Sequence, residues 1–179
     1  VVGARRDGHL YTVRGRHLRQ GRGTGDASNQ FSIYTPIVVE RRPEIDRFVN
    51  GYLTSDRMQL EELLEKREEF RTTLEPILAR EGLPVDLINI ALLESGFNPN
   101  IRSNQGAVGL WQFVANTARS YGLRVSRGVD ERRDIAKSTE AAALHFTELY
   151  EEFEDWSLVI AAYNCGSTAL RRAVQAGGT

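Results

Sequence analysis

The sequence predicts a mainly α protein, an irregular bundle of short helices with an extended N-terminal segment rich in arginine and glycine. Apolar residues recur at helical spacing through most of the chain after Pro43. Glycine and proline divide that part into short segments. Only one stretch, residues 34–40 (YTPIVVE), has the apolar and β-branched character of a strand.

The first 35 residues form a separate segment. They include RGRHLRQGRGTGDASNQ, which has little apolar periodicity. A loop or linker with solvated arginines is the simpler interpretation. The alternative is contact with an anionic surface, but the interleaved aromatic residues that would favour it are missing. We therefore divide the chain into an extended segment, 1–35, and one helical domain, 36–179.

The helical part begins with two helices. Apolar residues at helical spacing predict one over 44–53 and a longer one over 57–80, which Asp56 is placed to cap. Gly82 ends the longer helix. Pro84 then begins a third helix. Proline suits the first turn of a helix because the N–H group that it lacks would have no partner within the helix there.

The remaining helices follow a loop that begins at Gly96 and Pro99. Ser138 and Thr139 are placed to begin one of them. The apolar pattern predicts helices over 106–121, 140–153 and 156–164, with a last fragment over 170–175.

Composition argues against several classes of function. The 179 residues are 41% hydrophobic with a formal net charge of −1, so no global charge favours nucleic acid. No apolar run approaches the roughly 18 residues of a membrane-spanning helix, and the first residues lack the apolar core of a signal peptide. The single cysteine, Cys165, cannot form an internal disulfide. His9, His17 and His145 lack ligand spacing, so we expect neither a metal nor another cofactor.

One carboxylate, Glu94, ends the most apolar of the predicted helices. Apolar side chains surround that helix, and its C-terminal end carries the negative pole of the helix dipole. Desolvation and the dipole both raise the pKa of a carboxyl group, as a general acid at neutral pH requires. Gly96 suits the left-handed conformation that ends a helix. The alternative is a helix-terminal glutamate that is solvated or paired with a structural arginine.

Two further motifs offer groups that suit a carbohydrate. SNQGAVGLWQF combines small residues with the amide of Gln112 and with Trp111 and Phe113, whose rings either stack on a sugar or pack in the core. AAYNCG ends an apolar helix with Tyr163 and Asn164. A buried tyrosine hydroxyl needs a hydrogen-bond partner, and a carboxyl group of raised pKa would be a suitable one.

Five motifs carry a family resemblance: LLESGFNP, SNQGAVGLWQF, TARSYGL, DERRDIAKSTEAAALHF and DWSLVIAAYNCG. In this order and spacing they resemble the catalytic domain of lytic murein transglycosylases, the SLT fold of glycoside hydrolase family twenty-three, which is related to goose-type lysozyme. Trp111, the VDERRD run and the upstream PIVVERRPEIDRFVNGYL resemble the subtype called membrane-bound lytic murein transglycosylase D. The resemblance covers Thr35 to Ala173 and implies a lysozyme-like fold.

The resemblance implies a peptidoglycan lytic transglycosylase with Glu94 as its single catalytic acid/base. Glu94 would protonate the glycosidic oxygen between N-acetylmuramic acid and N-acetylglucosamine. Its carboxylate would then accept the proton of the muramic acid C6 hydroxyl, which attacks C1 and closes a 1,6-anhydro ring. Tyr163 would hold the Glu94 carboxyl or the reacting sugar. The matched motifs imply these substrate-binding residues around the cleft: Ser103, Gln112, Phe113, Tyr163 and Asn164.

Two other functions stay open. The acidic run from Asp130 to Asp134 either ties a loop to the next helix or holds a second catalytic carboxylate, which would indicate a hydrolase like goose-type lysozyme. The other alternative is a glycan-binding module without catalysis. Cys165 stands where the family usually has Ala or Ser, and we expect it to be a buried substitute.

The resemblance also implies a partner and a location. We expect a monomer that acts on peptidoglycan glycan strands in the bacterial periplasm or cell envelope, without nucleic acid. Outer-membrane attachment is expected only through segments outside this chain, which shows no lipid-anchoring Cys near its start and no LysM repeat. The sequence stops before the Tyr-bearing helix that follows in the family, so the domain is expected to be truncated at its C-terminal end.

Overall fold

A computed structural model describes residues 2–6, 9–13, 37 and 42–177. The chain divides into two compact units, Val1–Gln30 and Phe31–Thr179, and each is described by itself. The predicted boundary between residues 35 and 36 lies outside the described residues and stays a prediction. So does the strand-like stretch at 34–40, apart from Ile37.

The described part of the first unit is a β-hairpin. Strands β1 (Val2–Arg6) and β2 (His9–Val13) pair antiparallel, with Val2 opposite Val13 and Arg6 opposite His9. The sequence pattern predicts no strand here, so that expectation was wrong. The missed signal is the dipeptide Asp7-Gly8 between the strands, because Asp-Gly is strongly preferred in two-residue hairpin connections.

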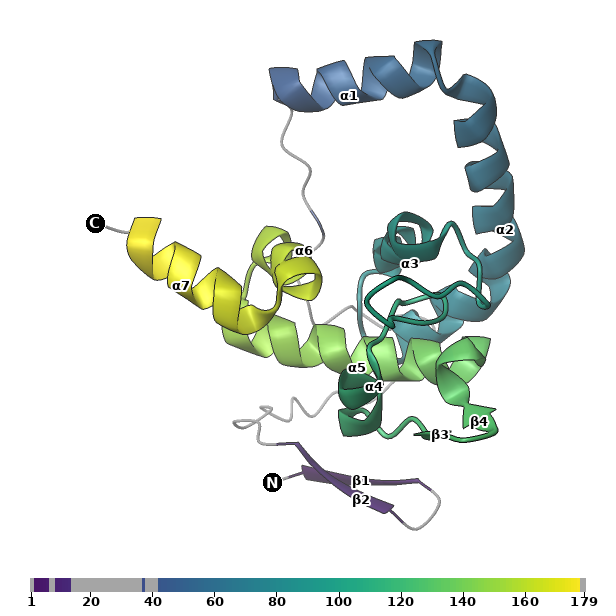
Figure 1. The fold of residues 1–179 in the computed structure, drawn as a ribbon. Coiled ribbons are helices and arrows are strands. Elements are labelled where there is room, and N and C mark those ends of the chain that lie inside the picture. The colour runs from purple at the N-terminus through teal and green to yellow at the C-terminus, as the bar shows by residue number, and fades with distance from the viewer. Residues whose placement is uncertain (1, 7–8, 14–36, 38–41, 178–179) are drawn as a thin grey trace, which may run out of the picture. The chain divides into compact units, whose positions relative to one another are not determined.

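The second unit consists mainly of helices, so the predicted mainly α class is confirmed (Figure 1). Its elements are α1 (Pro43–Thr54), α2 (Arg57–Arg80), the 3₁₀ turn η1 (Val85–Leu87), α3 (Ile88–Ser95), α4 (Ala115–Ser120), the short strands β3 (Val125–Ser126) and β4 (Val129–Asp130), the 3₁₀ turn η2 (Glu131–Arg133), α5 (Ile135–Phe153), α6 (Trp156–Cys165) and α7 (Ser167–Gly177). The predicted helix over 57–80 is confirmed at both ends.

The predicted helix over 106–121 was wrong for its first nine residues. Only α4 is helical there, and residues 101–114 form a loop. Gly106, Gly109 and Gln112 have φ angles of 82°, 88° and 47°, which a right-handed helix does not allow. We call residues 101–114 the glycine loop.

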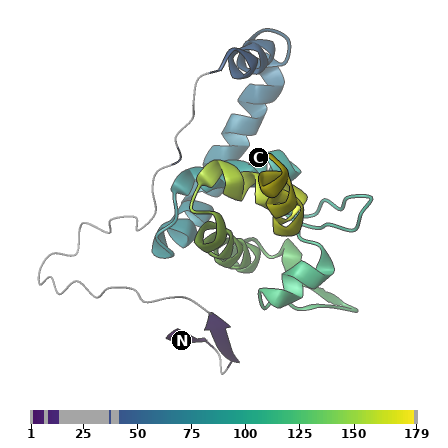
Figure 2. The same ribbon diagram turned by 90° about the vertical axis from the view of Figure 1, so that its left-hand side faces the viewer.

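The core of the second unit lies around α5, which packs against α2 and α6. Figure 1 shows α5 from the side and Figure 2 views along it. Trp111 of the glycine loop is buried in this core, where its indole N–H donates to the Thr139 hydroxyl at 2.9 Å and its ring packs edge-to-face with that of Phe146. Core packing is therefore the role of the Trp111 ring.

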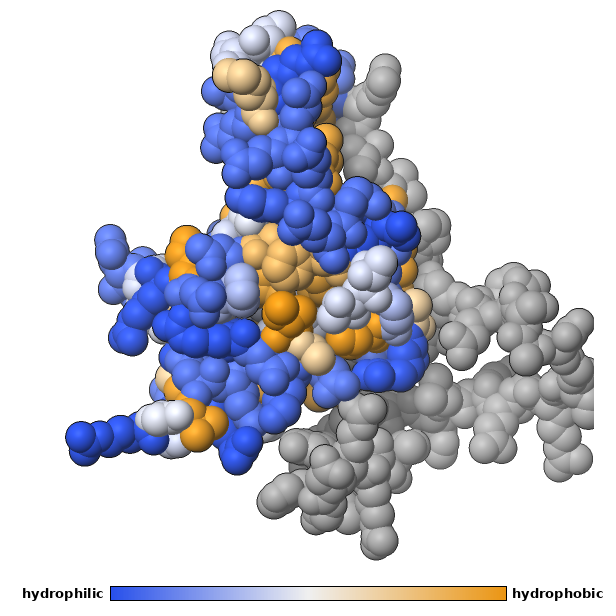
Figure 3. Space-filling model, turned by 90° about the vertical axis from the view of Figure 1, so that its right-hand side faces the viewer, coloured by the Kyte–Doolittle hydropathy of each residue, from blue (hydrophilic) through white to orange (hydrophobic). Residues whose placement is uncertain are grey.

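The surface over the first turns of α2 is hydrophilic, as Figure 3 shows on the face that it presents. The buried residues of α2 lie in its last two turns, at Leu74, Ile77 and Leu78. Among the described helices, none combines the length and the apolar character that crossing a bilayer requires.

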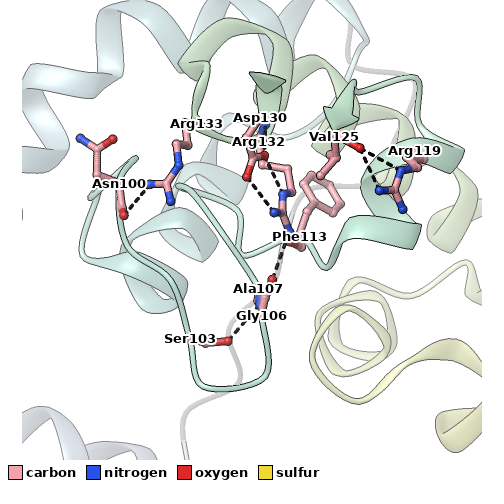
Figure 4. A network of polar contacts seen from close by, with 10 residues as sticks. All are labelled: Asn100, Ser103, Gly106, Ala107, Phe113, Arg119, Val125, Asp130, Arg132 and Arg133. Atoms are coloured by element: carbon pink, nitrogen blue, oxygen red, sulfur yellow. Dashed lines mark hydrogen bonds and ion pairs between the residues drawn. The ribbon is translucent and has the colours of Figure 1, made fainter. Parts of the chain in front are cut away.

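A buried guanidinium group holds the glycine loop in place (Figure 4). Arg132 is 4% exposed, and its Nη1 donates to the carbonyl oxygens of Gly106 at 3.1 Å and Phe113 at 3.0 Å. Its Nε and Nη2 donate to the Asp130 carboxylate at 2.8 and 2.7 Å, which balances the buried charge. Arg132 thus ties both ends of the loop's Gly-rich part to η2.

Gly109 lies against the backbone of the same arginine. A Cβ atom at Gly109 would lie 1.9 Å from the Arg132 carbonyl oxygen, far inside van der Waals contact. The positive φ of Gly109 also disfavours a side chain. The close approach of the loop to η2 therefore requires glycine at this position.

We predict that Arg132→Ala lowers the free energy of unfolding by about 3 kcal/mol, because it leaves Asp130 without its ion pair and two loop carbonyls without donors. Urea denaturation measures this value. Arg127→Ala, on the exposed β3–β4 turn, is the matched control and should change stability by less than about 0.5 kcal/mol. Equal stability of the two variants would contradict the role given to Arg132.

Candidate active site

A cavity of about 990 Å³ opens between the end of α3, the glycine loop and the junction of α6 with α7. All six residues predicted for the site line it, and the glycine loop and α6 contribute most of them. They are Glu94, Ser103, Gln112, Phe113, Tyr163 and Asn164. The folded chain therefore brings together residues that lie up to 70 positions apart.

Glu94 is the penultimate residue of α3. Gly96 follows in the left-handed conformation at φ 56°, and its N–H donates to the Leu92 carbonyl at 2.8 Å, so the helix ends as its sequence predicts. Burial raises the pKa of the Glu94 carboxyl above its ordinary value. Among the described residues, none donates a hydrogen bond to this carboxylate or pairs with it.

Glu94 is also the only carboxylate among the described residues that line the cavity. The acidic run from Asp130 to Asp134, the alternative source of a second catalytic carboxylate, makes structural contacts instead. Glu131 is hydrogen-bonded to Arg124 and Lys137, and the Arg124 contact in particular lowers the Glu131 pKa to about 2. Asp130 pairs with Arg132, and Asp134 caps α5 by accepting from the Lys137 N–H. The run is therefore structural.

Ser95, beside Glu94, was missed by the sequence pattern. Its hydroxyl is buried and lies 2.9 Å from the carbonyl oxygens of both Ala91 and Leu110, between which it shares its single proton. This contact joins the end of α3 to the glycine loop. A serine in the sequence carries no signal for such a contact, because its partner Leu110 is fixed only by the fold.

The Tyr163 hydroxyl also holds the glycine loop. It donates to the carbonyl oxygen of Trp111 at 2.8 Å. The expectation that Tyr163 holds the Glu94 carboxyl or the reacting sugar stays a prediction. Burial, and secondarily the charge of Glu94, raise the pKa of Tyr163, which keeps its proton for this bond.

Gln112 and Ser103 present polar groups from the loop. The side-chain amide nitrogen of Gln112 donates to the Gly109 carbonyl at 2.8 Å, which leaves its oxygen without a partner among the described residues. The Ser103 oxygen accepts from the N–H groups of Ala107 at 3.1 Å and Gln105 at 3.3 Å. Its own hydroxyl proton stays free to donate.

Three further cavity residues, Phe113, Asn164 and Cys165, differ in exposure. Phe113 is 3% exposed, its ring centroid lies 6.4 Å from that of Tyr163, and little of it is open to the cavity that it lines. Asn164 is exposed at the end of α6. Cys165 is exposed as well, so its expected burial was wrong, because it lines the cavity at the end of α6.

His145 and Arg172 line the cavity too and were not predicted for the site. His145 lies inside the DERRDIAKSTEAAALHF motif, but the motif did not mark it as a site residue, because most of the rings around it come from other elements. Among the described residues, no three His, Cys, Asp or Glu side chains are grouped as metal ligands would be.

The chain resembles known proteins in its second unit. The sequence profile of the transglycosylase SLT domain matches residues 75–179. Membrane-bound lytic murein transglycosylase D of Escherichia coli (strain K12) is 32% identical over 137 residues, which are 74% of this chain and 30% of that protein. Peptidoglycan transglycosylase gp16 of Escherichia phage T7 is 37% identical over 92 residues, 50% of this chain and 7% of that protein.

A solved structure also matches. The X-ray structure of an inactive mutant of lytic transglycosylase Slt from Pseudomonas aeruginosa aligns with a TM-score of 0.49 at 26% identity. The alignment covers 56% of this chain and 17% of that one. This chain thus spans under a third of each of these proteins.

We predict that Glu94→Gln raises the thermal unfolding midpoint at pH 7. Burial raises the folded-state pKa of Glu94, so ionisation favours the unfolded chain as the pH rises above the ordinary glutamate value of about 4.3. Glutamine does not ionise, so the difference in unfolding midpoint between the variant and the wild type should shrink as the pH falls to about 4. Calorimetry between pH 4 and 7 measures this. A variant that is less stable than the wild type at pH 7 would contradict the burial of the charge.

Proposed function

The chain belongs to the transglycosylase SLT domain family, and we propose that it is a lytic transglycosylase that cleaves the β-1,4 bond between N-acetylmuramic acid and N-acetylglucosamine in peptidoglycan. The observation that carries the proposal is the single carboxylate of the cavity, Glu94, whose pKa is raised by burial. A protonated carboxyl near neutral pH is what a general acid needs. The names of the two relatives agree with this activity.

The reaction proceeds in two proton transfers on Glu94. The protonated carboxyl donates to the glycosidic oxygen as the bond from that oxygen to C1 breaks. The resulting carboxylate accepts the proton of the muramic acid C6 hydroxyl, whose oxygen bonds to C1. Glu94 ends protonated, as it began, and no water is consumed. The product carries a 1,6-anhydro ring.

The lack of a second carboxylate in the described lining of the cavity supports this reaction over hydrolysis. Hydrolysing glycosidases use two carboxyl groups on either side of the bond, one of them to activate water or to attack C1. Glu94 is the only carboxylate in the described lining of the cavity. The candidates of the acidic run, Asp130 and Glu131, are held in ion pairs with Arg132 and Arg124. When a hydroxyl group of the substrate itself is the nucleophile, one carboxyl group that first donates and then accepts a proton is enough.

The other cavity residues bind the sugar chain in this proposal. The Gln112 side-chain oxygen and the Ser103 hydroxyl offer an acceptor and a donor, which suit hydroxyl and acetamido groups. Asn164 adds an exposed amide at the end of α6. Phe113 gives an apolar contact. Tyr163 acts through the Trp111 carbonyl, by holding the loop that carries Gln112.

The wider setting follows from the same proposal. The partner is a peptidoglycan glycan strand, and the protein acts as a monomer in the bacterial periplasm or cell envelope. Residues 36–179 form the catalytic domain in this proposal, and residues 1–35 are a segment outside it.

We predict that Glu94→Gln lowers the release of muropeptides from purified peptidoglycan by at least about 100-fold, because general acid catalysis contributes on that scale. Liquid chromatography of the soluble products measures the release. Glu65→Gln, the same change on the exposed surface of α2, is the control and should leave the rate unchanged. Retained activity in the Glu94 variant would overturn the proposal.

A further inference from the structure

We propose that His145 binds the sugar chain in the cleft as a hydrogen-bond acceptor, with its Nε2 atom receiving an N–H or O–H of the substrate, and that Tyr121 and Glu148 position its ring for this role. The inference rests on the proposed function, because it names a further substrate contact in the same cavity.

His145 lies on α5 and lines the Glu94 cavity. Aromatic rings surround its imidazole: the ring centroid of Tyr121 is 4.9 Å away, that of Tyr163 5.2 Å and that of Phe113 6.2 Å. Phe113 and Tyr163 belong to the predicted site. The imidazole is thus packed among residues of the cavity wall, which restricts its orientation.

A hydrogen-bond chain fixes which ring nitrogen carries the proton. The Tyr121 hydroxyl is 2.5 Å from a carboxylate oxygen of Glu148 and 2.6 Å from Nδ1 of His145. A carboxylate only accepts, so Tyr121 donates its single proton to Glu148. The Tyr121 oxygen is then an acceptor toward the ring, and Nδ1 of His145 is the donor. Nε2 is left with a lone pair.

The ring is neutral at pH 7, so Nε2 keeps that lone pair. Burial lowers the pKa of His145 to about 4, although the charge of Glu148 acts in the opposite direction. The other ionisable groups that face the ring are the hydroxyls of Tyr121 and Tyr163. Burial raises the pKa of both, so they too are uncharged at pH 7.

Nε2 is not fully shielded from solvent. In the described part of the chain, every side-chain nitrogen or oxygen shielded from solvent has a hydrogen-bond partner. The hydrogen bond of His145 is made by Nδ1, and no described residue pairs with Nε2, so Nε2 is reached by solvent. The cavity that His145 lines is the one that contains Glu94. A neutral hydrogen-bond acceptor in the cavity favours a substrate group that donates. A glycan of N-acetylated sugars offers such donors in its acetamido N–H and hydroxyl groups.

The first test is kinetic and uses soluble, uncross-linked peptidoglycan strands. His145→Phe keeps a ring but removes the acceptor, and should raise KM roughly three- to tenfold with little change in kcat, as expected for one lost hydrogen bond. His145→Gln returns an acceptor oxygen near the Nε2 position and should restore most of the loss. Tyr52→Phe, on the exposed surface of α1, is the control. An unchanged KM in His145→Phe would overturn the inference.

The second test reads the ring itself by ¹⁵N NMR of the labelled protein at pH 7. The expected spectrum shows a neutral ring protonated on Nδ1, and the Nε2 signal moves when N-acetylglucosamine oligomers are added. Tyr121→Phe removes the group that fixes the tautomer and should give a mixture, with a smaller rise in KM. A ring protonated on Nε2, or an Nε2 signal that does not respond while Gln112 does, would overturn the inference.

The two tests separate this inference from the proposed function. A wild-type protein that releases no muropeptides would refute the function, and the saccharide titration would still decide whether Nε2 is an acceptor in the cavity. A wild-type protein that is active but keeps its KM in His145→Phe would refute the inference alone.

Discussion

The geometry of the cavity depends on how the backbone carbonyls of the glycine loop are held. Arg132 fixes the carbonyls of Gly106 and Phe113 from η2. Ser95 holds that of Leu110 from α3, and Tyr163 holds that of Trp111 from α6. The loop forms no helix and only isolated β-bridges, from Val108 to Arg102 and Phe113, so these side-chain contacts supply much of what secondary structure would. They bring the loop beside Glu94 and keep the Gln112 amide in the wall of the cavity.

Two glutamates show how the fold assigns different chemistry to the same side chain. Glu131 is buried beside Arg124 and Lys137, and these contacts lower its pKa to about 2 and keep it ionised. Glu94 is desolvated without a cationic partner among the described residues, so its pKa moves the other way. The carboxylate of lowered pKa stabilises structure here, and the one whose pKa is raised is better suited to acid catalysis.

Local patterns in the sequence predicted what depends on local interactions. The helix over 57–80 and the end of α3 at Gly96 follow from apolar spacing and from glycine in the left-handed conformation. The glycine loop was mistaken for a helix because its shape depends on Arg132, which is distant in sequence. The Tyr163 partner and the His145 tautomer depend on tertiary contacts in the same way. The missed hairpin is different, because its Asp7-Gly8 signal was present in the sequence.

The central claim is that one carboxylate suffices because the substrate provides the nucleophile. Digestion of peptidoglycan in ¹⁸O-labelled water, followed by mass spectrometry of the fragments, tests it most directly. The single-carboxylate mechanism predicts 1,6-anhydro termini, one water lighter than reducing termini and free of ¹⁸O. Reducing N-acetylmuramic acid termini that carry one ¹⁸O atom would show that water attacks C1, and would contradict it.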